Sequence, residues 1–164
     1  MVVIVMGLPG SGKSYFAIRA AKMLNAVYIS SDKLRKEMFV KPTYSSAEKL
    51  CVYNKMLQRA TGASEHGKDV VLDATFYSND LRQIFINEAK SISRAYIIEV
   101  YADENLVKER LSLPREDSDA DFEVYKAVKK EWEPFNDEHL VLDSTNDDIT
   151  EMLERVADYL FEKK

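Results

Sequence analysis

The residues Gly7-Leu8-Pro9-Gly10-Ser11-Gly12-Lys13-Ser14 complete the pattern G-x-x-x-x-G-K-[ST], and they directly follow the apolar run Val2–Met6. A strand, a glycine-rich loop and a helix start therefore occur in the order that a phosphate-binding loop requires. The glycines let successive backbone N–H groups point inward at a polyphosphate, and the following helix adds the positive end of its dipole. The sequence thus predicts a nucleotide-binding P-loop domain.

Within this loop, we expect Lys13 to reach the β- and γ-phosphates and the Ser14 hydroxyl to ligate Mg²⁺. A glycine-rich turn that binds nothing is the alternative, but the preceding strand and the following helix favour phosphate binding. The residues predicted to contact the nucleotide are Gly7, Pro9, Gly10, Ser11, Gly12, Lys13, Ser14 and Tyr15.

The length of 164 residues fits one domain, residues 1–164. A composition of 46% apolar and 31% charged residues is ordinary for a soluble globular protein. No apolar stretch approaches the roughly 20 residues that span a bilayer. The first residues lack the basic leader of a signal peptide, so we expect a cytoplasmic protein that does not bind membranes.

The formal net charge of −5 disfavours a broad nucleic-acid-binding face, which needs a basic surface to displace phosphate counterions. A local basic patch stays possible, as do a monomer and a homodimer. The single cysteine, Cys51, cannot form an internal disulfide. It lies in a helical pattern, where we expect a buried apolar role.

Short β-branched or aromatic runs alternate with longer helical patterns along the chain. About five strands separated by helices predict a three-layer α/β fold, with a parallel sheet covered by helices on both faces. The predicted strands are Val2–Met6, Ala26–Ser30, Val70–Asp73, Ala95–Tyr101 and His139–Asp143.

Ligands of such sheets bind beyond the carboxyl ends of the strands, which selects the residues that can do chemistry. Asp73 ends the run Val70–Asp73 and looks like a Walker B carboxylate that holds the metal, or its water shell, opposite Ser14. Thr75 can orient the same shell. The alternative is that Asp73 only caps a turn.

Asp32 follows the second predicted strand, and Arg35 lies three residues further on, so both can face one cavity. A carboxylate there can accept the proton of a substrate hydroxyl, and an arginine can hold the substrate. This pair predicts a phosphoryl-acceptor site. Alternatively, Asp32 is a helix N-cap and Arg35 is a solvated helix residue.

A polar, acidic segment at about residues 112–121 is predicted to act as a lid. Arg110 and Arg115 are spaced to reach over a nucleotide if this segment closes, because phosphoryl transfer depends on charge neutralisation. The alternative is that neighbouring carboxylates engage both arginines in surface ion pairs. The predicted catalytic residues are Lys13, Asp32, Arg35, Arg110 and Arg115.

Four segments of the chain together carry a family resemblance. They are the glycine-rich loop 7–14, Ser31-Asp32-Lys33-Leu34-Arg35, Val71-Leu72-Asp73-Ala74-Thr75, and residues 115–120 followed by a helix and Glu133-Pro134. With these segments the chain resembles the small P-loop kinases grouped with phage polynucleotide kinase, zeta-toxin-like kinases and chloramphenicol phosphotransferase. The resemblance implies a sheet ordered 2-3-1-4-5, ATP·Mg²⁺ as donor, Asp32 as general base, Arg35 on the acceptor and an arginine lid.

These observations favour a kinase that transfers the γ-phosphoryl group of ATP to a hydroxyl of a small molecule, a nucleoside or a 5′-hydroxyl oligonucleotide. No Asn-Lys-x-Asp guanine motif occurs, which favours ATP over GTP. A nucleotide-dependent switch or regulatory ATPase acting on a protein partner is the alternative.

Two further placements concern the pockets of such a kinase. By fold analogy, adenine packs near Asp143-Ser144-Thr145. Four aromatic residues are candidates to line an acceptor pocket or to stack on a base. The alternative is that Tyr53 packs in the core and the others lie on a surface of mixed polarity. The four are Tyr44, Tyr53, Phe76 and Tyr77.

Overall fold

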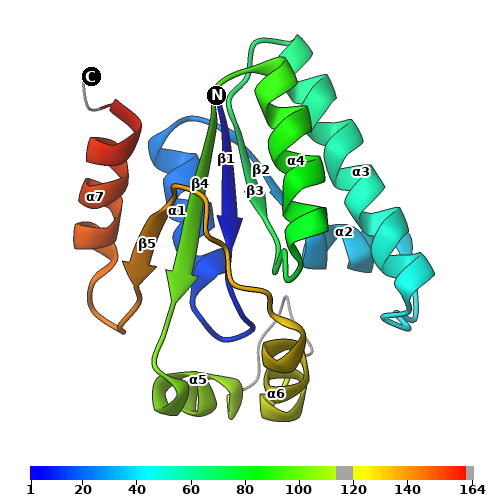
Figure 1. The fold of residues 1–164 in the computed structure, drawn as a ribbon, viewed down its shortest axis with the longest axis vertical. Helices are drawn as coiled ribbons and strands as arrows, with labels where there is room; N and C mark the ends of the chain where they lie inside the picture. The colour runs from blue at the N-terminus through cyan, green and yellow to red at the C-terminus, as the bar shows by residue number, and fades with distance from the viewer. Residues whose placement is uncertain (114–119, 162–164) are drawn as a thin grey trace.

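The computed structural model describes residues 1–113 and 120–161. Its sheet has five parallel strands in the order β2-β3-β1-β4-β5, which confirms the predicted fold class and strand order (Figure 1). The strands are β1 Val2–Met6, β2 Val27–Ser30, β3 Val70–Asp73, β4 Ala95–Tyr101 and β5 Leu140–Asp143.

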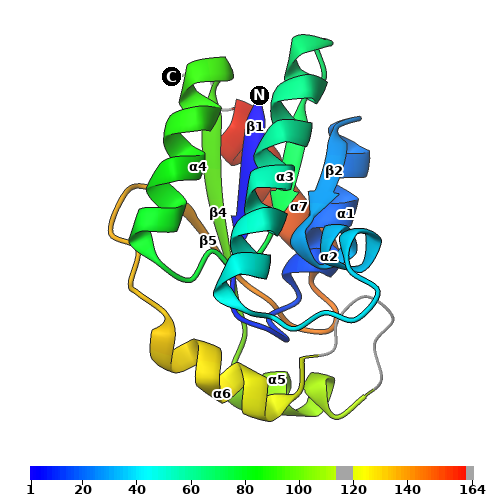
Figure 2. The same ribbon diagram turned by 90° about the vertical axis from the view of Figure 1, so that its right-hand side faces the viewer.

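Helices cover both faces of this sheet. Helices α1 and α7 lie on one face, and α3 and α4 lie on the other (Figures 1 and 2). The helices are α1 Lys13–Met23, α2 Ser31–Met38, α3 Ser46–Glu65, α4 Asn79–Ile92, α5 Glu104–Leu111, α6 Phe122–Glu131 and α7 Ile149–Phe161.

Strand β1 is the centre of the fold, and all five of its residues are buried. Ile4 packs in the core beneath α3 and α4, whereas Val3 and Val5 pack beneath α1 and α7. A strand covered on both faces needs apolar residues at every position, which explains the continuous run in the sequence. In the register, Val5 pairs with Asp73 of β3, so the loop after β1 begins beside this carboxylate.

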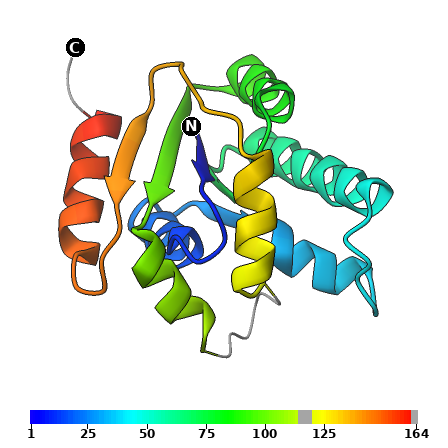
Figure 3. The same cartoon turned by 60° about the horizontal axis from the view of Figure 1, so that its bottom comes forward.

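Helices α5 and α6 lie beyond the carboxyl edge of the sheet, and they contact each other (Figure 3). A small apolar cluster joins them through Val107 and Leu111 of α5 and Tyr125 of α6. Leu8 of the glycine-rich loop packs against this cluster. The two helices therefore cover the carboxyl edge of the sheet, where the predicted site residues lie.

The helix starts follow the polar caps of the sequence. The Ser45 hydroxyl accepts a hydrogen bond from the Glu48 N–H at the start of α3. The expectation of a buried Cys51 is wrong, because its side chain is exposed. Helix α3 buries Val52 and Met56 instead, and Cys51 is turned about 100° away from its neighbour Val52 on the helix.

Arg82 of α4 is the largest fully buried side chain among the described residues, and only 1% of its surface is exposed. Its guanidinium donates to the Phe76 carbonyl at 2.6 Å, the Glu133 carbonyl at 2.6 Å and the Tyr77 carbonyl at 3.3 Å. The ring of Trp132 stacks over it at 4.5 Å. This one side chain therefore ties the loop after β3 to the segment after α6.

Replacing Arg82 by leucine should destabilise the fold by about 3 kcal/mol, because several buried carbonyls lose their donor. The exposed Arg155 makes a single 2.9 Å bond to the Val141 carbonyl, and Arg155→Ala is the matched control. Its loss should cost less than about 1 kcal/mol. Urea unfolding of both variants measures the difference, and equal losses would refute the structural role of Arg82.

Candidate active site

The glycine-rich loop, residues 7–14, is shaped by close backbone contacts. A Cβ atom on Gly7 would lie 2.4 Å from the Val100 carbonyl oxygen, so this position has no room for a side chain. Gly12 has a φ of +89° and forms the N-cap of α1. The loop therefore leads directly into the N-terminus of α1, the end of a helix that favours an anion.

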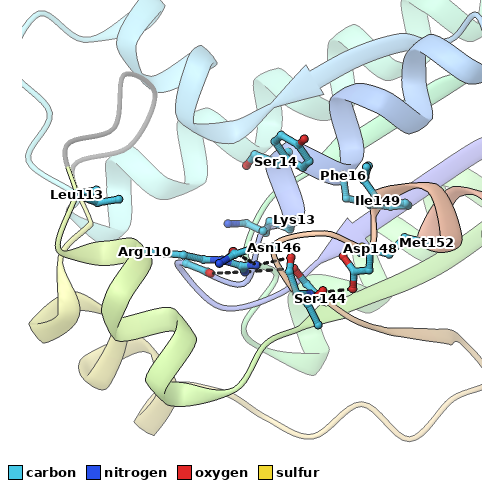
Figure 4. Close-up of a pocket in the computed structure, with 14 residues that line it drawn as sticks. Lys13, Ser14, Phe16, Arg110, Leu113, Ser144, Asn146, Asp148, Ile149 and Met152 are labelled. Atoms are coloured by element: carbon cyan, nitrogen blue, oxygen red, sulfur yellow. Dashed lines mark hydrogen bonds between the residues drawn. The ribbon is translucent and has the colours of Figure 1, made fainter.

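A cavity of about 490 Å³, here called the P-loop cavity, opens beside this loop and the start of α1 (Figure 4). Tyr15, a residue that is 54% exposed, borders it, and the centre of its ring lies 3.3 Å from the Arg19 guanidinium carbon. The residues that line it are Gly10, Gly12, Lys13, Ser14, Tyr15, Phe16, Arg110, Leu113, Ser144, Thr145, Asn146, Asp148, Ile149 and Met152.

Arg110 is a fixed part of the wall of the P-loop cavity. Its guanidinium donates to the Gly10 carbonyl at 3.3 Å, the Ser144 hydroxyl at 3.1 Å and the Thr145 carbonyl at 2.7 Å (Figure 4). Burial lowers its pKa, and Asp148 and Glu109 oppose that effect. Arg110 thus links the P-loop to the loop after β5, whereas Arg115 lies outside the described residues.

Asp73 and Ser14 form the predicted metal site. Asp73 is 1% exposed, and its Oδ1 has no hydrogen-bond partner within the described residues. Burial raises the pKa of Asp73, while the charge of Lys13 and hydrogen bonds with Tyr28 and Ser14 oppose this rise. A buried oxygen without a partner, next to a hydroxyl and a lysine, fits a Mg²⁺ ion that keeps several waters.

The described residues contain no cluster of three or more His, Cys, Asp or Glu side chains that would hold a metal by themselves. The donor set at Asp73 and Ser14 is therefore sparse. Such a set suits Mg²⁺, because this ion usually binds through one or two protein groups together with substrate phosphates.

Tyr28 of β2 is a member of this site that the sequence reasoning missed. Its hydroxyl donates to Asp73 Oδ2 at 2.6 Å, and burial together with the charge of Asp73 raises the pKa of Tyr28. The bond orients the carboxylate and leaves Oδ1 as its open oxygen. The pairing of β2 with β3 could have indicated it, because Tyr28 lies opposite Val71, near the end of that strand.

A second cavity of about 310 Å³, here called the tyrosine cavity, lies on the other side of Lys13. It contains Pro9, which was predicted to contact the nucleotide, as well as Thr75. Phe76 lies in the core instead, fully buried. The residues that line the cavity are Pro9, Lys13, Ser31, Asp32, Arg35, Tyr44, Lys49, Tyr53, Thr75, Tyr77, Ala120, Val124, Val128 and Glu131.

Asp32 and Arg35 both line the tyrosine cavity, as their spacing predicts. Ser30 caps α2 by accepting a hydrogen bond from the Lys33 N–H, so the Asp32 carboxylate is not used as the N-cap. Arg35 is 6% exposed and forms a buried ion pair with Glu48 of α3. The alternative of a solvated arginine is therefore wrong.

Glu48 holds the corner between α2 and α3. Its carboxylate accepts hydrogen bonds from the Thr43 N–H at 2.6 Å, the Thr43 hydroxyl at 2.9 Å and the Tyr44 N–H at 3.2 Å. Burial opposes its charge, but these bonds and the Arg35 guanidinium lower the pKa of Glu48 to about 2. The ion pair with Arg35 is thus intact at neutral pH and is lost only as the pH falls toward that value.

Gly12→Ala should lower the affinity for ATP on the order of tenfold or more, since the new Cβ would lie 2.7 Å from the Ser144 hydroxyl and 3.2 Å from Arg110 at a positive φ. Gly62→Ala is the matched control, because this helical glycine of α3 has nothing within 4 Å of an added Cβ. It should stabilise the fold by about 0.5–1 kcal/mol and leave binding unchanged. Calorimetric titration with ATP and Mg²⁺ measures both affinities, and an unchanged affinity in Gly12→Ala would refute this role of the loop.

No helix in the described ranges 1–113 and 120–161 has the length and apolar character to cross a membrane.

Residues 2–135 match a protein family described as an AAA domain. The fold is similar to an unliganded sugar kinase from Janibacter sp. HTCC2649, with 15% identity, a TM-score of 0.75, and coverage of 97% of this chain and 93% of that chain.

Two further solved structures are similar. The APS kinase CysC of Mycobacterium tuberculosis, in complex with AMPPNP and APS, has 19% identity and a TM-score of 0.73, with 97% and 96% of the two chains covered. Chaetomium thermophilum Kti12, in complex with ADP-AlF3, has 21% identity and a TM-score of 0.70, with 96% and 98% covered. These likenesses confirm the P-loop fold and agree with the resemblance inferred from the motifs.

Proposed function

The chain belongs to the AAA domain family, and from this premise we propose that it is an ATP-dependent kinase that transfers the γ-phosphoryl group to a hydroxyl. ATP·Mg²⁺ is the donor. The acceptor is an alcohol that binds in the tyrosine cavity. The sugar kinase and the APS kinase described above support this assignment by analogy of fold.

One observation carries the proposal: Lys13 lines the P-loop cavity and the tyrosine cavity at once. A kinase needs a donor site and an acceptor site that meet at the transferred phosphoryl group. The P-loop lysine is the residue that contacts this group in P-loop proteins. A switch that only hydrolyses nucleotide has no use for a second lined cavity at this lysine.

On the donor side, the P-loop amides and the α1 N-terminus bind the phosphates, and Lys13 neutralises their charge. Asp73 and Ser14 would hold Mg²⁺, which would supply further charge neutralisation on the phosphate oxygens. Arg110 keeps the loop and the wall formed by Ser144 and Thr145 in place. The base of ATP then lies against the remaining part of this wall.

On the acceptor side, we assign Asp32 as the general base. Its carboxylate is half-buried in the wall of the tyrosine cavity, in the first turn of α2. It accepts the proton of the acceptor hydroxyl as the oxygen attacks the phosphoryl group. Arg35, fixed by Glu48, holds the acceptor beside it. Arg115 stays a proposed lid residue.

Asp32→Ala should abolish phosphoryl transfer and leave the ATP affinity within a few fold, because the base acts only on the acceptor. Lys13→Ala should instead weaken ATP binding itself. Asp80→Ala is the matched control, since Asp80 is an exposed carboxylate in the first turn of α4, and this change should alter neither property.

The measurement is transfer from γ-labelled ATP with Mg²⁺ to pooled alcohols, nucleosides and 5′-hydroxyl oligonucleotides, next to buffer alone. Label in an acceptor pool that disappears in Asp32→Ala supports the kinase. Release of free phosphate alone, at the same rate in Asp32→Ala, contradicts it and favours a regulatory ATPase. Transfer that survives in Asp32→Ala would remove the base assignment but not the kinase.

A further inference from the structure

We propose that the acceptor is an alcohol that carries both a planar ring and a negative charge, with the ring against the tyrosine side chains and the anion at Lys49. This inference rests on the proposed kinase function and names the class of its acceptor. It is carried by the shape, the aromatic lining and the charges of the tyrosine cavity.

The anion is inferred from the cations that line the cavity. Lys13 also serves the P-loop cavity, and Arg35 is already paired with the buried Glu48. Lys49 lies in the first turns of α3 with its Nζ 5.3 Å from the centre of the Tyr77 ring. Within residues 1–113 and 120–161, no carboxylate forms an ion pair with it. Lys49 therefore offers an acidic group of the ligand a cation that no described carboxylate neutralises, in addition to Arg35, which holds the acceptor.

The position of Lys49 on its helix also favours an anion beside it. The N-terminus of α3 carries the positive end of the helix dipole, which disfavours a lysine there and favours an anion. The neighbouring carboxylate on this helix, Glu48, already accepts hydrogen bonds from Arg35, Thr43 and Tyr44. A negative group on the ligand would thus offset the charge of the Lys49 ammonium, which lies close to the positive end of the α3 dipole.

The planar ring is inferred from the aromatic lining. Tyr44, Tyr53 and Tyr77 reach the cavity from three different segments of the chain. Flat ligands gain from stacking or edge contacts with such rings. On the remaining side, Val124 and Val128 of α6 add an apolar surface. These rings and valines give a planar ligand broad apolar surfaces to contact.

The rings are held in place by the protein itself. Tyr53 packs edge-on against Phe85 with ring centroids 5.6 Å apart. The Tyr77 carbonyl accepts hydrogen bonds from the Glu133 N–H and from Arg82. Tyr44 has a φ of +56°, and its ring lies 4.8 Å from the guanidinium carbon of Arg35. A non-glycine residue in this region of φ is costly, and such positions gather at ligand sites.

The size of the cavity limits the ligand. A volume of about 310 Å³ is at the small end of the range of small-molecule sites, which runs from about 300 to 1,000 Å³. A compound of one or two rings with a single charged group fits such a space. Two kinds of compound combine a planar ring with a negative charge, a nucleoside phosphate and an aromatic carboxylate. The experiment below distinguishes them.

The test measures the binding and the phosphorylation of matched compounds. Uridine 3′-monophosphate and 4-(hydroxymethyl)benzoate carry a ring and a charge. Uridine and benzyl alcohol carry only the ring, gluconate carries only the charge, and glucose carries neither. Binding is measured by calorimetry with the non-hydrolysable AMPPNP and Mg²⁺ present, and transfer is measured with labelled ATP.

We expect one of the two charged ring compounds to bind at least about tenfold more tightly than its uncharged partner, and gluconate and glucose to bind more weakly still. Lys49→Met should remove this preference without changing the affinity for the uncharged ring compounds. Lys55→Met is the matched control, because Lys55 lies on the same helix, outside the cavity, and bonds to Gln58. It should leave every affinity unchanged.

The outcomes separate this inference from the proposed function. Charge-dependent binding that is lost in Lys49→Met, without any transfer, would support the ligand class and contradict the kinase. Transfer to glucose or to an uncharged compound that is insensitive to Lys49→Met would support the kinase and overturn the ligand class. Equal binding of charged and uncharged partners, or binding of none of the compounds, would also overturn it.

Discussion

The parallel pairing of β1 with β3 is the constraint on which the site depends. Because Val5 pairs with Asp73, the glycine-rich loop and the acidic end of β3 begin at the same level of the sheet. Pairing of β2 with β3 adds Ser30 at that level, so α2 starts there with Asp32 in its first turn. A register shift of one residue would turn Asp73 to the opposite face. The burial of β1 on both faces fixes this register, and the register in turn places Asp73 beside the glycine-rich loop.

Buried charge at the tyrosine cavity has an energetic cost that the fold offsets with hydrogen bonds. An ion pair such as Arg35–Glu48 loses hydration when it is buried, and it is stable only if its remaining polar groups are satisfied. Glu48 meets this condition through Thr43 and Tyr44. The Arg35 Nε has no partner in the described part of the chain. The pair therefore fixes α2 against α3 at the cavity more than it stabilises the protein.

The sequence was informative where a feature depends on neighbours along the chain. The glycine-rich loop, the strand ends and the spacing of Asp32 and Arg35 are local patterns, and the structure brings these residues to one edge. Contacts between distant residues were not predictable, because Tyr28 meets Asp73 45 residues away and Arg82 meets Glu133 51 residues away. The bonds of Glu48 to Arg35 and Thr43 depend on how the loop before α3 folds. The sheet order came from the family resemblance.

The two cavities that share Lys13 are built from different parts of the chain, so the proposed acceptor site can vary independently of the P-loop cavity. The P-loop cavity is lined by α1, by Arg110 of α5 and by the loop before α7. Hydrogen bonds from Arg110 hold these parts together. The tyrosine cavity uses α2, α3, the loop after β3 and α6. Arg82 anchors the segment after α6 without touching the P-loop. Changes in α6 or at Lys49 would therefore alter the proposed acceptor site and leave the lining of the P-loop cavity unchanged, which is how function changes on a shared scaffold.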